Sequence, residues 1–222
     1  MRKLLFILIA CAVSAGFAFP DDYWPRTYFV GAGASVGGSF GDLNDHTLSA
    51  VDSAGNKEKV YPPDLGLIFH PDFYMGVNIR DFSLAIAFQY QKMDYDLTKA
   101  PNDLDETESR IWRFGFEFTY NLFWPDPLQF GFGMGYSFTN LKTKKSAVSE
   151  ECVSASELMG SALVFVLNAH YFFNDYMAIV PSIKFHETWF KSVYTKQSGT
   201  SDLDDYLWQS FLVGGIALQF QF

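Results

Sequence analysis

The sequence of 222 residues predicts an all-β protein, an eight-stranded antiparallel up-and-down transmembrane β-barrel. Three observations support this prediction. Large apolar residues alternate with small or polar residues in eight segments of the chain. The connections between these segments are alternately long and short. Aromatic residues make up 18% of the chain, and a membrane barrel can place such rings outside, against lipid and at the interfaces.

The charge of the chain narrows the range of partners. The formal net charge is −9 and the isoelectric point is near 4.8. Nucleic acid calls for a basic patch, so we expect no nucleic-acid partner.

The N-terminus is predicted to be a signal peptide over residues 1–18, followed by the barrel domain over residues 19–222. Arg2 and Lys3 form a positive start, residues 4–13 are apolar, and Ala18 offers a small residue at the cleavage site. The apolar stretch is far shorter than the ~20 residues that a membrane-spanning helix needs. We therefore expect an exported protein that enters a membrane, if at all, as strands.

Two cysteines bear on this leader. Cys11 follows Leu-Ile-Ala, which resembles a bacterial lipoprotein signal, and its lipidation is left open. The residues after it stay apolar, however, which favours cleavage after Ala18. Cys152 would then be alone in the mature chain and could form no intramolecular disulfide.

Four segments alternate most clearly, namely 65–79, 82–91, 112–121 and 128–139. In 112–121, for example, Trp, Phe and Tyr occupy every even position, and Arg, Gly, Glu, Thr and Asn occupy the odd ones. Successive side chains of a strand point to opposite faces, so each segment predicts a strand with one large apolar face and one small polar face.

Four further segments alternate less regularly, namely 28–37, 160–171, 177–189 and 208–222. In 160–171, Val164 and Val166 fall on the otherwise small and polar face. We still predict a strand in each, which completes a barrel of eight.

The large residues are expected on the outside of this barrel. An eight-stranded barrel has an interior just wide enough for modest side chains, so it cannot hold all the bulky residues. The opposite face is rich in Gly, Ala, Ser and Gln and fits a narrow lumen. An exposed apolar surface of this extent is untenable in water, and lipid is the environment that accepts it.

The connections predict the topology. Those expected to be long are 41–62, 94–109, 140–158 and 192–206, and those expected to be short are 80–81, 123–127 and 174–175. Long loops at one end and short turns at the other, with both termini at the short-turn end, are typical of outer-membrane barrels.

Aromatic side chains are predicted to form a girdle at each membrane interface, where such rings are favoured. The turn-side girdle comprises Trp24, Tyr28, Tyr120, Trp124, Tyr171 and Tyr176. The loop-side girdle comprises Tyr90, Trp112, Tyr136, Trp189 and Trp208. The alternative left open is that aromatic residues merely end strands often.

The chain from about residue 27 to its end resembles the small eight-stranded outer-membrane barrels of the OmpX and OmpA transmembrane-domain type. The most specific match is the final strand, with Gly215, Leu218, Phe220 and a terminal Phe222 in phase. The resemblance implies that these residues form the signal read by the barrel-assembly machinery.

Four charged residues fall on the small-residue face near the middle of their strands: Asp72, Arg113, Glu117 and Lys184. A buried isolated charge is very costly, so none should remain unpaired. We predict a lumen charge network in which Glu117 contacts Lys184 or Arg113, and Asp72 accepts from Arg113 or from a lumen Tyr or His. A catalytic role for the four is the alternative.

The remaining residues give only weak evidence for a catalytic or metal-binding site. Barrel enzymes that modify lipid A use a His with a Ser, and neither His46 with Ser49 nor His186 with Thr188 matches that pairing. His70 and His170 are expected as hydrogen-bonded lumen residues. The acidic loop 94–109 lacks the spacing and glycine of a calcium loop, and binding of divalent cations there is left open. We expect no enzyme, no cofactor and no metal site.

The sequence therefore predicts a protein of the cell outer membrane with a structural or surface-interaction role and a lumen filled by polar side chains. Its expected partners are outer-membrane lipid, lipopolysaccharide and, during insertion, the barrel-assembly machinery, with the barrel itself a monomer. The alternatives are a narrow pore, a lipid A-modifying enzyme and, more weakly, a soluble lipocalin-like binder.

Overall fold

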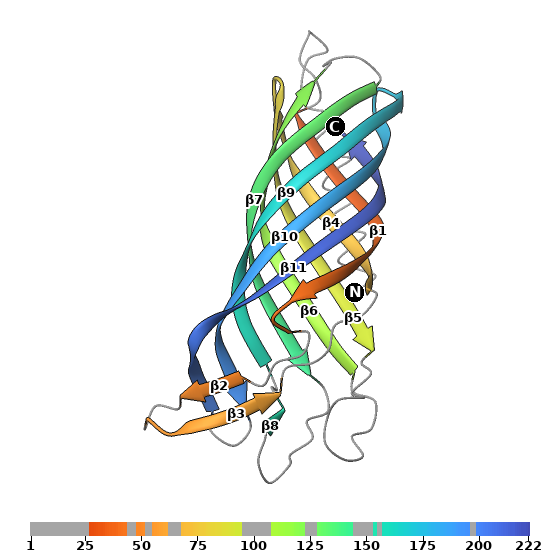
Figure 1. The fold of residues 1–222 in the computed structure, drawn as a ribbon. Helices are drawn as coiled ribbons and strands as arrows, with labels where there is room; N and C mark the ends of the chain where they lie inside the picture. The colour runs from red at the N-terminus through yellow and green to blue at the C-terminus, as the bar shows by residue number, and fades with distance from the viewer. Residues whose placement is uncertain are drawn as a thin grey trace.

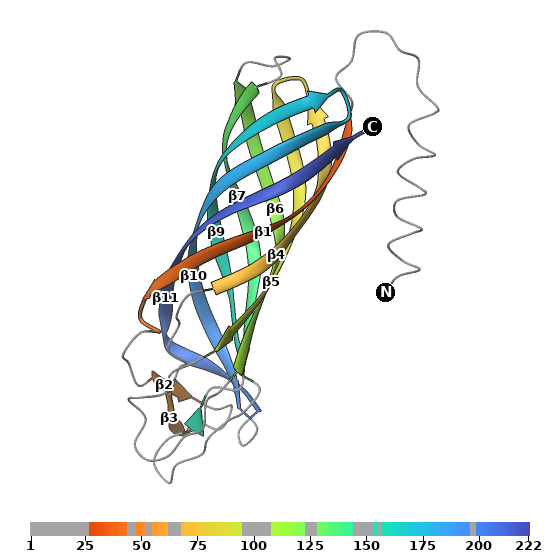
Figure 2. The same cartoon turned by 90° about the vertical axis from the view of Figure 1, so that its right-hand side faces the viewer.

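The computed structural model describes residues 27–43, 48–51, 55–61, 68–94, 108–122, 128–143, 153–154, 157–195 and 199–222. Their main feature is a closed ring of antiparallel strands (Figures 1 and 2). The strands of the ring, in order, are β1 (Tyr28–Gly41), β4 (Ile68–Ile79), β5 (Phe82–Asp94), β6 (Glu108–Leu122), β7 (Leu128–Thr143), β9 (Glu157–Asn174), β10 (Met177–Thr195) and β11 (Gly199–Gln221). The predicted eight-stranded barrel is confirmed.

The ring closes between its first and last strands. β1 pairs with β11 from Phe29 opposite Gln221 to Gly41 opposite Gln209. At the turn end, the Tyr28 and Phe222 backbones exchange two hydrogen bonds of 3.1 and 2.9 Å, and their rings stack. Closure removes the free edge that an open sheet would leave, so every strand of the ring has two neighbours.

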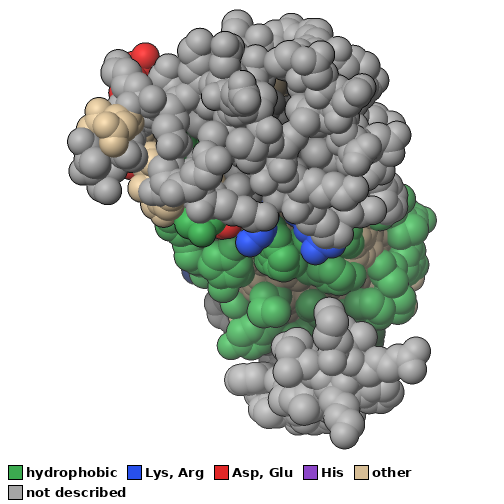
Figure 3. Space-filling model, turned by 90° about the horizontal axis from the view of Figure 1, so that it is seen from below, with side chains coloured by type: hydrophobic (Ala, Val, Ile, Leu, Met, Phe, Trp, Pro, Cys, Tyr) green, Lys and Arg blue, Asp and Glu red, His purple; other side chains and the backbone are tan. Residues whose placement is uncertain are grey.

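The alternation of the sequence corresponds to the two faces of the barrel wall. On β6, the side chains of Phe114, Phe116 and Phe118 are exposed on the outside, whereas Arg113 and Thr119 are buried inside. The same facing holds along the other predicted strands wherever side chains are described. In Figure 3 apolar side chains cover the visible flank of the barrel. The predicted assignment of large residues to the exterior is confirmed.

Val164 and Val166 explain the weaker pattern in 160–171. Both are buried and point into the lumen from β9, while Leu163, Phe165 and Leu167 are exposed outside. The strand is therefore regular, and its lumen face is simply more apolar than that of its neighbours.

Two of the predicted tight turns are described at one end of the barrel. Arg80 and Asp81 join β4 to β5, with Arg80 in the left-handed region at φ 55°. Asn174 and Asp175 join β9 to β10, where the Tyr176 amide donates to the Asn174 side chain at 2.9 Å. The turn predicted at 123–127 lies outside the described residues.

The opposite end corrects the predicted loops. The long loop predicted at 192–206 is wrong, because β10 extends to Thr195 and β11 begins at Gly199, with these ends paired. The predicted loop 41–62 contains β2 (Leu48–Val51) and β3 (Lys57–Tyr61), and the predicted loop 140–158 contains β8 (Val153–Ser154). These strands form a small sheet on the end of β11 (Figure 1). They lie beyond the apolar wall, where nothing requires large apolar residues on one face.

The aromatic side chains of the predicted loop-side girdle lie in contact with one another. Tyr90 and Trp112 meet edge to face with ring centroids 4.9 Å apart. Trp189 joins Tyr136 to Trp208, with centroid distances of 6.2 and 5.8 Å. At the turn side, Tyr28, Tyr171 and Tyr176 are exposed, while Trp24 and Trp124 lie outside the described residues. Among the described residues, no helix is long and apolar enough to cross a membrane.

Candidate functional site in the barrel lumen

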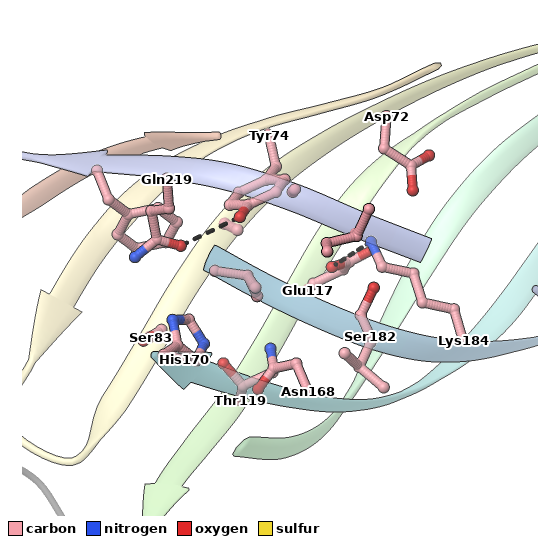
Figure 4. Close-up of a pocket in the computed structure, with 16 residues that line it drawn as sticks. Asp72, Tyr74, Ser83, Glu117, Thr119, Asn168, His170, Ser182, Lys184 and Gln219 are labelled. Carbon is pink, nitrogen blue, oxygen red and sulfur yellow. Dashed lines mark hydrogen bonds and ion pairs between the residues drawn. The ribbon is translucent and has the colours of Figure 1, made fainter. Parts of the chain in front are cut away.

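The centre of the lumen holds an ion pair between strands that are not neighbours. Lys184 Nζ of β10 donates to both carboxylate oxygens of Glu117 on β6, at 2.7 and 2.9 Å (Figure 4). The two side chains are 8% and 12% exposed. The predicted contact of Glu117 with Lys184 is thus present in the structure. The pair spans the lumen, because β7 and β9 lie between its two strands.

The lumen face of β7 leaves room for this pair. Gly135 lies opposite Glu117 on β6, and Gly133 lies in the same register row as Val166 and Lys184. Residues without side chains at these positions let two long charged side chains meet across the barrel. The glycine periodicity of 128–139 therefore has a packing role inside the lumen.

Asp72 lies near this pair but forms a different contact in the wall of the lumen. Its side chain points from β4 toward Glu117 and Lys184 in Figure 4, and it accepts a hydrogen bond from the Ser35 hydroxyl on β1. The predicted donors to Asp72 were Arg113 or a lumen Tyr or His, and Ser35 was not among them. Asp72, Glu117 and Lys184 line a cavity together with Tyr74, whose hydroxyl donates to Gln219 at 3.2 Å.

Gly215 on β11 makes the Ser35 contact possible. It lies opposite Ser35 in the β1–β11 ladder. A Cβ atom added at Gly215 would lie 2.2 Å from the Ser35 hydroxyl oxygen, so a larger residue would displace this hydroxyl. Gly215, expected from the resemblance to belong to the assembly signal, therefore also has a place in the lumen.

Arg113 differs from the other three charged residues. It is 2% exposed, and its guanidinium carbon lies 4.2 Å from the centroid of the Phe211 ring. None of its three side-chain nitrogens has a hydrogen-bond partner among the described residues. The structure thus joins Glu117 to Lys184 directly, and the four-residue network as a whole stays a prediction.

The loop-side end of the lumen holds buried apolar side chains among buried polar ones such as Gln91, Thr188 and Gln209, so the expectation of a lumen filled by polar side chains holds only in part. A buried cluster packs there, formed by Leu43, Ile111, Leu141, Leu158, Phe190, Val193, Leu207, Phe211 and Val213, and we call it the apolar plug. Ile111, Leu141, Leu158 and Val193 form one register row across β6, β7, β9 and β10. These residues escaped prediction because Ile111 lies just outside a predicted strand and Leu141, Leu158 and Val193 lie in stretches predicted to be loops.

The turn-side part of the lumen is polar. The Asn121 amide donates to the Ser83 hydroxyl at 2.7 Å, and this hydroxyl donates to Asn78 at 2.8 Å. His170 is buried there and stacks on Phe172, which agrees with its expected inward position, but its Nε2 has no hydrogen-bond partner among the described residues, so the expected hydrogen bond is absent at that atom. The side chain of His70 lies outside the described residues. The lumen is therefore polar on the turn side of the ion pair and contains both polar side chains and the apolar plug on its loop side.

The other candidate catalytic and metal-binding residues are either buried or outside the described residues. His186 and Thr188 are both buried in the lumen on β10. His46 and the acidic stretch 95–107 fall outside the described residues. Within the described part of the chain, no group of three His, Cys, Asp or Glu side chains could hold a metal ion.

The predicted assembly-signal residues lie at the seam of the ring. Leu218 and Phe220 are exposed on the outer face of β11, and Phe222 stacks on Tyr28. Their reading by an assembly machinery stays a prediction.

Comparisons with known proteins show the fold. No family model matches the chain, and no curated protein matches it. The structure of Neisserial surface protein A (NspA) is similar, with 14% identity over 88% of this chain and 97% of that chain and a TM-score of 0.52. The outer membrane protein OprG from Pseudomonas aeruginosa is similar, with 12% identity over 89% of this chain and 97% of that chain and a TM-score of 0.53. The outer membrane protease OmpT from Escherichia coli has 11% identity, coverage of 91% and 99%, and a TM-score of 0.46. The resemblance to small outer-membrane barrels is confirmed for the fold.

Proposed function

We propose that this chain is a protein of the cell outer membrane whose barrel is closed to solutes and whose loop end contacts other molecules at the cell surface. Its wall supports a membrane location, because large apolar side chains such as Phe116, Phe132 and Leu167 are exposed all around the ring. Such a surface marks a lipid-facing exterior and would be an aggregation liability in water.

The single observation that carries the closed lumen is the apolar plug. It fills the loop-side end of the barrel with fully buried side chains, including Ile111, Phe190 and Phe211. Below it the Glu117–Lys184 pair crosses the lumen. A narrow pore would need a continuous path lined by polar groups or water, and these two layers obstruct one.

The loop end supports a surface-interaction role. β10 and β11 continue beyond the aromatic side chains of Trp189 and Trp208, and β11 adds β2 there through Asp202 and Leu203. This small sheet provides a structured surface above the membrane. We propose lipid and lipopolysaccharide as the surroundings of the wall, and a monomeric barrel, since each strand of the ring is already paired on both sides.

A lipid A-modifying activity is the second candidate, and the site disfavours it. His186 and Thr188 are buried in the lumen, out of reach of a lipid on the outer face of the wall. Mass spectrometry of lipid A from cells that express the protein should show no new species. A mass shift that is lost in His186→Ala would establish the enzyme instead.

Conductance in planar bilayers tests the closed lumen. The wild-type barrel should give no stable conductance steps, and the variant Phe190→Ala with Phe211→Ala should give them if the apolar plug is the barrier. The matched control is Phe165→Ala, an outward-facing side chain. Steady conductance by the wild type would overturn the proposal.

Protease added to whole cells tests the orientation. Cleavage is expected at the loop end, near Gly55, Lys144 and Gly199, and not at the 174–175 turn. Cleavage confined to that turn would reverse the proposed orientation. Fractionation with heat-modifiable gel mobility tests the membrane location, and extraction without detergent would refute it.

A further inference from the structure

One carboxylate lies on the apolar outer face of the wall. On β10, Lys184 and His186 are buried in the lumen. The alternate side chains of Phe185, Glu187 and Trp189 therefore face outside. Among the outward-facing residues that the structure describes between the two aromatic girdles, Glu187 alone carries a charge. An ionisable side chain within the membrane is costly, and its position there indicates a functional contact.

Ser210 on β11 satisfies only part of this carboxylate. The two residues lie opposite each other in the β10–β11 ladder, and the Ser210 hydroxyl donates to one carboxylate oxygen of Glu187 at 2.5 Å. Within the described part of the chain, no cation forms an ion pair with Glu187. An ionised carboxylate accepts about four hydrogen bonds and donates none. A further partner at this site therefore has to supply N–H or O–H donors from the lipid side.

Aromatic rings lie next to this carboxylate and indicate its depth. Trp189 follows it by two residues toward the loop end, roughly 6–7 Å along the strand, and contacts Trp208 with ring centroids 5.8 Å apart. On its turn side Phe185 contacts Phe40, which lies opposite Ser210 in the β1–β11 ladder. Tryptophan rings are favoured at the level of the lipid headgroups. The carboxylate therefore lies just below that level, where the acyl chains of the lipid begin.

The outer face of the wall is open on the turn side of Ser210. Gly38 of β1 and Gly214 of β11 face outside, and a Cβ atom added at either would meet nothing within 4 Å. Gly38 lies opposite Leu212, one outward position below Ser210, and Gly214 is the next outward position of β11. A hydrocarbon chain that begins beside the carboxylate has room to lie against these two glycines.

We infer that Glu187 and Ser210 bind lipid A, the lipid part of lipopolysaccharide, through the N–H and hydroxyl groups of its amide-linked hydroxyacyl chains. The inference rests on the proposed location and orientation, which place the loop end of the barrel in the lipopolysaccharide leaflet. At this depth glycerophospholipids present ester carbonyl groups, which donate no hydrogen bond to a carboxylate. Hydroxyacyl amides supply the donors, and one acyl chain packs beside Gly38 and Gly214. The phosphates of lipid A lie further out, among the headgroups and away from Glu187.

Native mass spectrometry of the purified barrel in detergent tests this lipid preference. The probes are lipid A with its phosphates removed, phosphatidylcholine, which has no hydrogen-bond donor, and phosphatidylethanolamine, whose donors lie on the headgroup. The wild type should retain the dephosphorylated lipid A about tenfold more strongly than phosphatidylcholine, because hydrogen bonds to a charged group are gained. Glu187→Leu should abolish this preference and leave the retention of phosphatidylcholine unchanged. The control Met134→Leu, on the outer face of β7, should behave as the wild type does.

A second variant keeps the carboxylate and fills the space beside it. Gly38→Leu should weaken the retention of lipid A several-fold, with folding of each variant checked by heat-modifiable mobility on a gel. Equal retention of lipid A and phosphatidylcholine by the wild type, or a preference that survives Glu187→Leu, would overturn the inference. Stronger retention of phosphatidylethanolamine than of lipid A would also overturn it and assign the carboxylate to an ammonium headgroup. These failures leave the membrane fractionation of the wild type unchanged, whereas a failure of the proposed function would appear in that fractionation.

Discussion

The Glu117–Lys184 pair allows a quantitative test of the lumen by a double-mutant cycle with Glu117→Gln and Lys184→Met. The Nζ atom lies 2.7 and 2.9 Å from the two carboxylate oxygens, and both side chains are almost fully buried. At an effective dielectric constant of 20, two unit charges at such distances attract by about 6 kcal/mol. Part of this attraction offsets the cost of removing both ions from water.

Either single substitution leaves a buried charge without its partner. Each is therefore expected to lower the free energy of unfolding by about 3–5 kcal/mol. The double variant removes both charges and should lose no more than one single variant does, because no orphaned ion remains. The cycle should then give a coupling energy of at least about 3 kcal/mol, measured by urea unfolding in detergent.

The pair of Lys142 and Glu157 is a control for this cycle in the same barrel. Its atoms are 3.5 Å apart, and the lysine side chain is 60% exposed at the loop end. An exposed pair of this kind should couple by about 0–1 kcal/mol. Additivity of Glu117→Gln and Lys184→Met to within about 0.5 kcal/mol would show that the two residues do not meet, and the cross-lumen pair would be refuted.

Two further substitutions test the wall and the seam. Phe116→Arg places a cation on the lipid face and should cost roughly 2–4 kcal/mol in folding into bilayers. Thr119→Gln, on the lumen side of the same strand, should be tolerated far better. Equal losses for the two variants would show that the facing of β6 is wrong. Gly215→Ala should lower the free energy of unfolding by about 1–3 kcal/mol because the new methyl group displaces the Ser35 hydroxyl. Gly214→Ala, whose Cβ would meet nothing within 4 Å, should be nearly neutral. The same small effect for both variants would argue against the hydrogen bond from Ser35 to Asp72.

The wall of the barrel could be predicted from the sequence because the environment of each face is uniform. Trp112, Phe114 and Phe116 face outside on one strand, and Arg113 faces inside between them. A period of two is all that such a wall requires. Beyond the apolar wall this requirement ends, so the polar residues 192–206 gave no sign that β10 and β11 continue there.

The contents of the lumen were harder to predict, for two physical reasons. Which strands meet across the barrel depends on the stagger of the ladders, so alternation could place Glu117 and Lys184 on one face without deciding between Lys184 and Arg113 as the partner of Glu117. Apolar lumen residues also weaken the signal that reveals a strand. On β11, Phe211 and Val213 are buried in the lumen and Leu212 is exposed outside, and all three are apolar. This apolar run is the sign of the apolar plug that the sequence contains.

The apolar plug and the ion pair depend on each other. A salt bridge that water can reach contributes little to the free energy of unfolding. A desolvated salt bridge fixes the positions of its two strands, because separating its charges is costly. The register row of Ile111, Leu141, Leu158 and Val193 covers the lumen on the loop side. Shortening these side chains should therefore weaken the coupling between Glu117 and Lys184 as well as the packing, although no plug residue needs to touch the pair. A Glu117–Lys184 coupling energy that stays unchanged in Leu141→Ala would mean that the polar layer excludes water without the apolar plug.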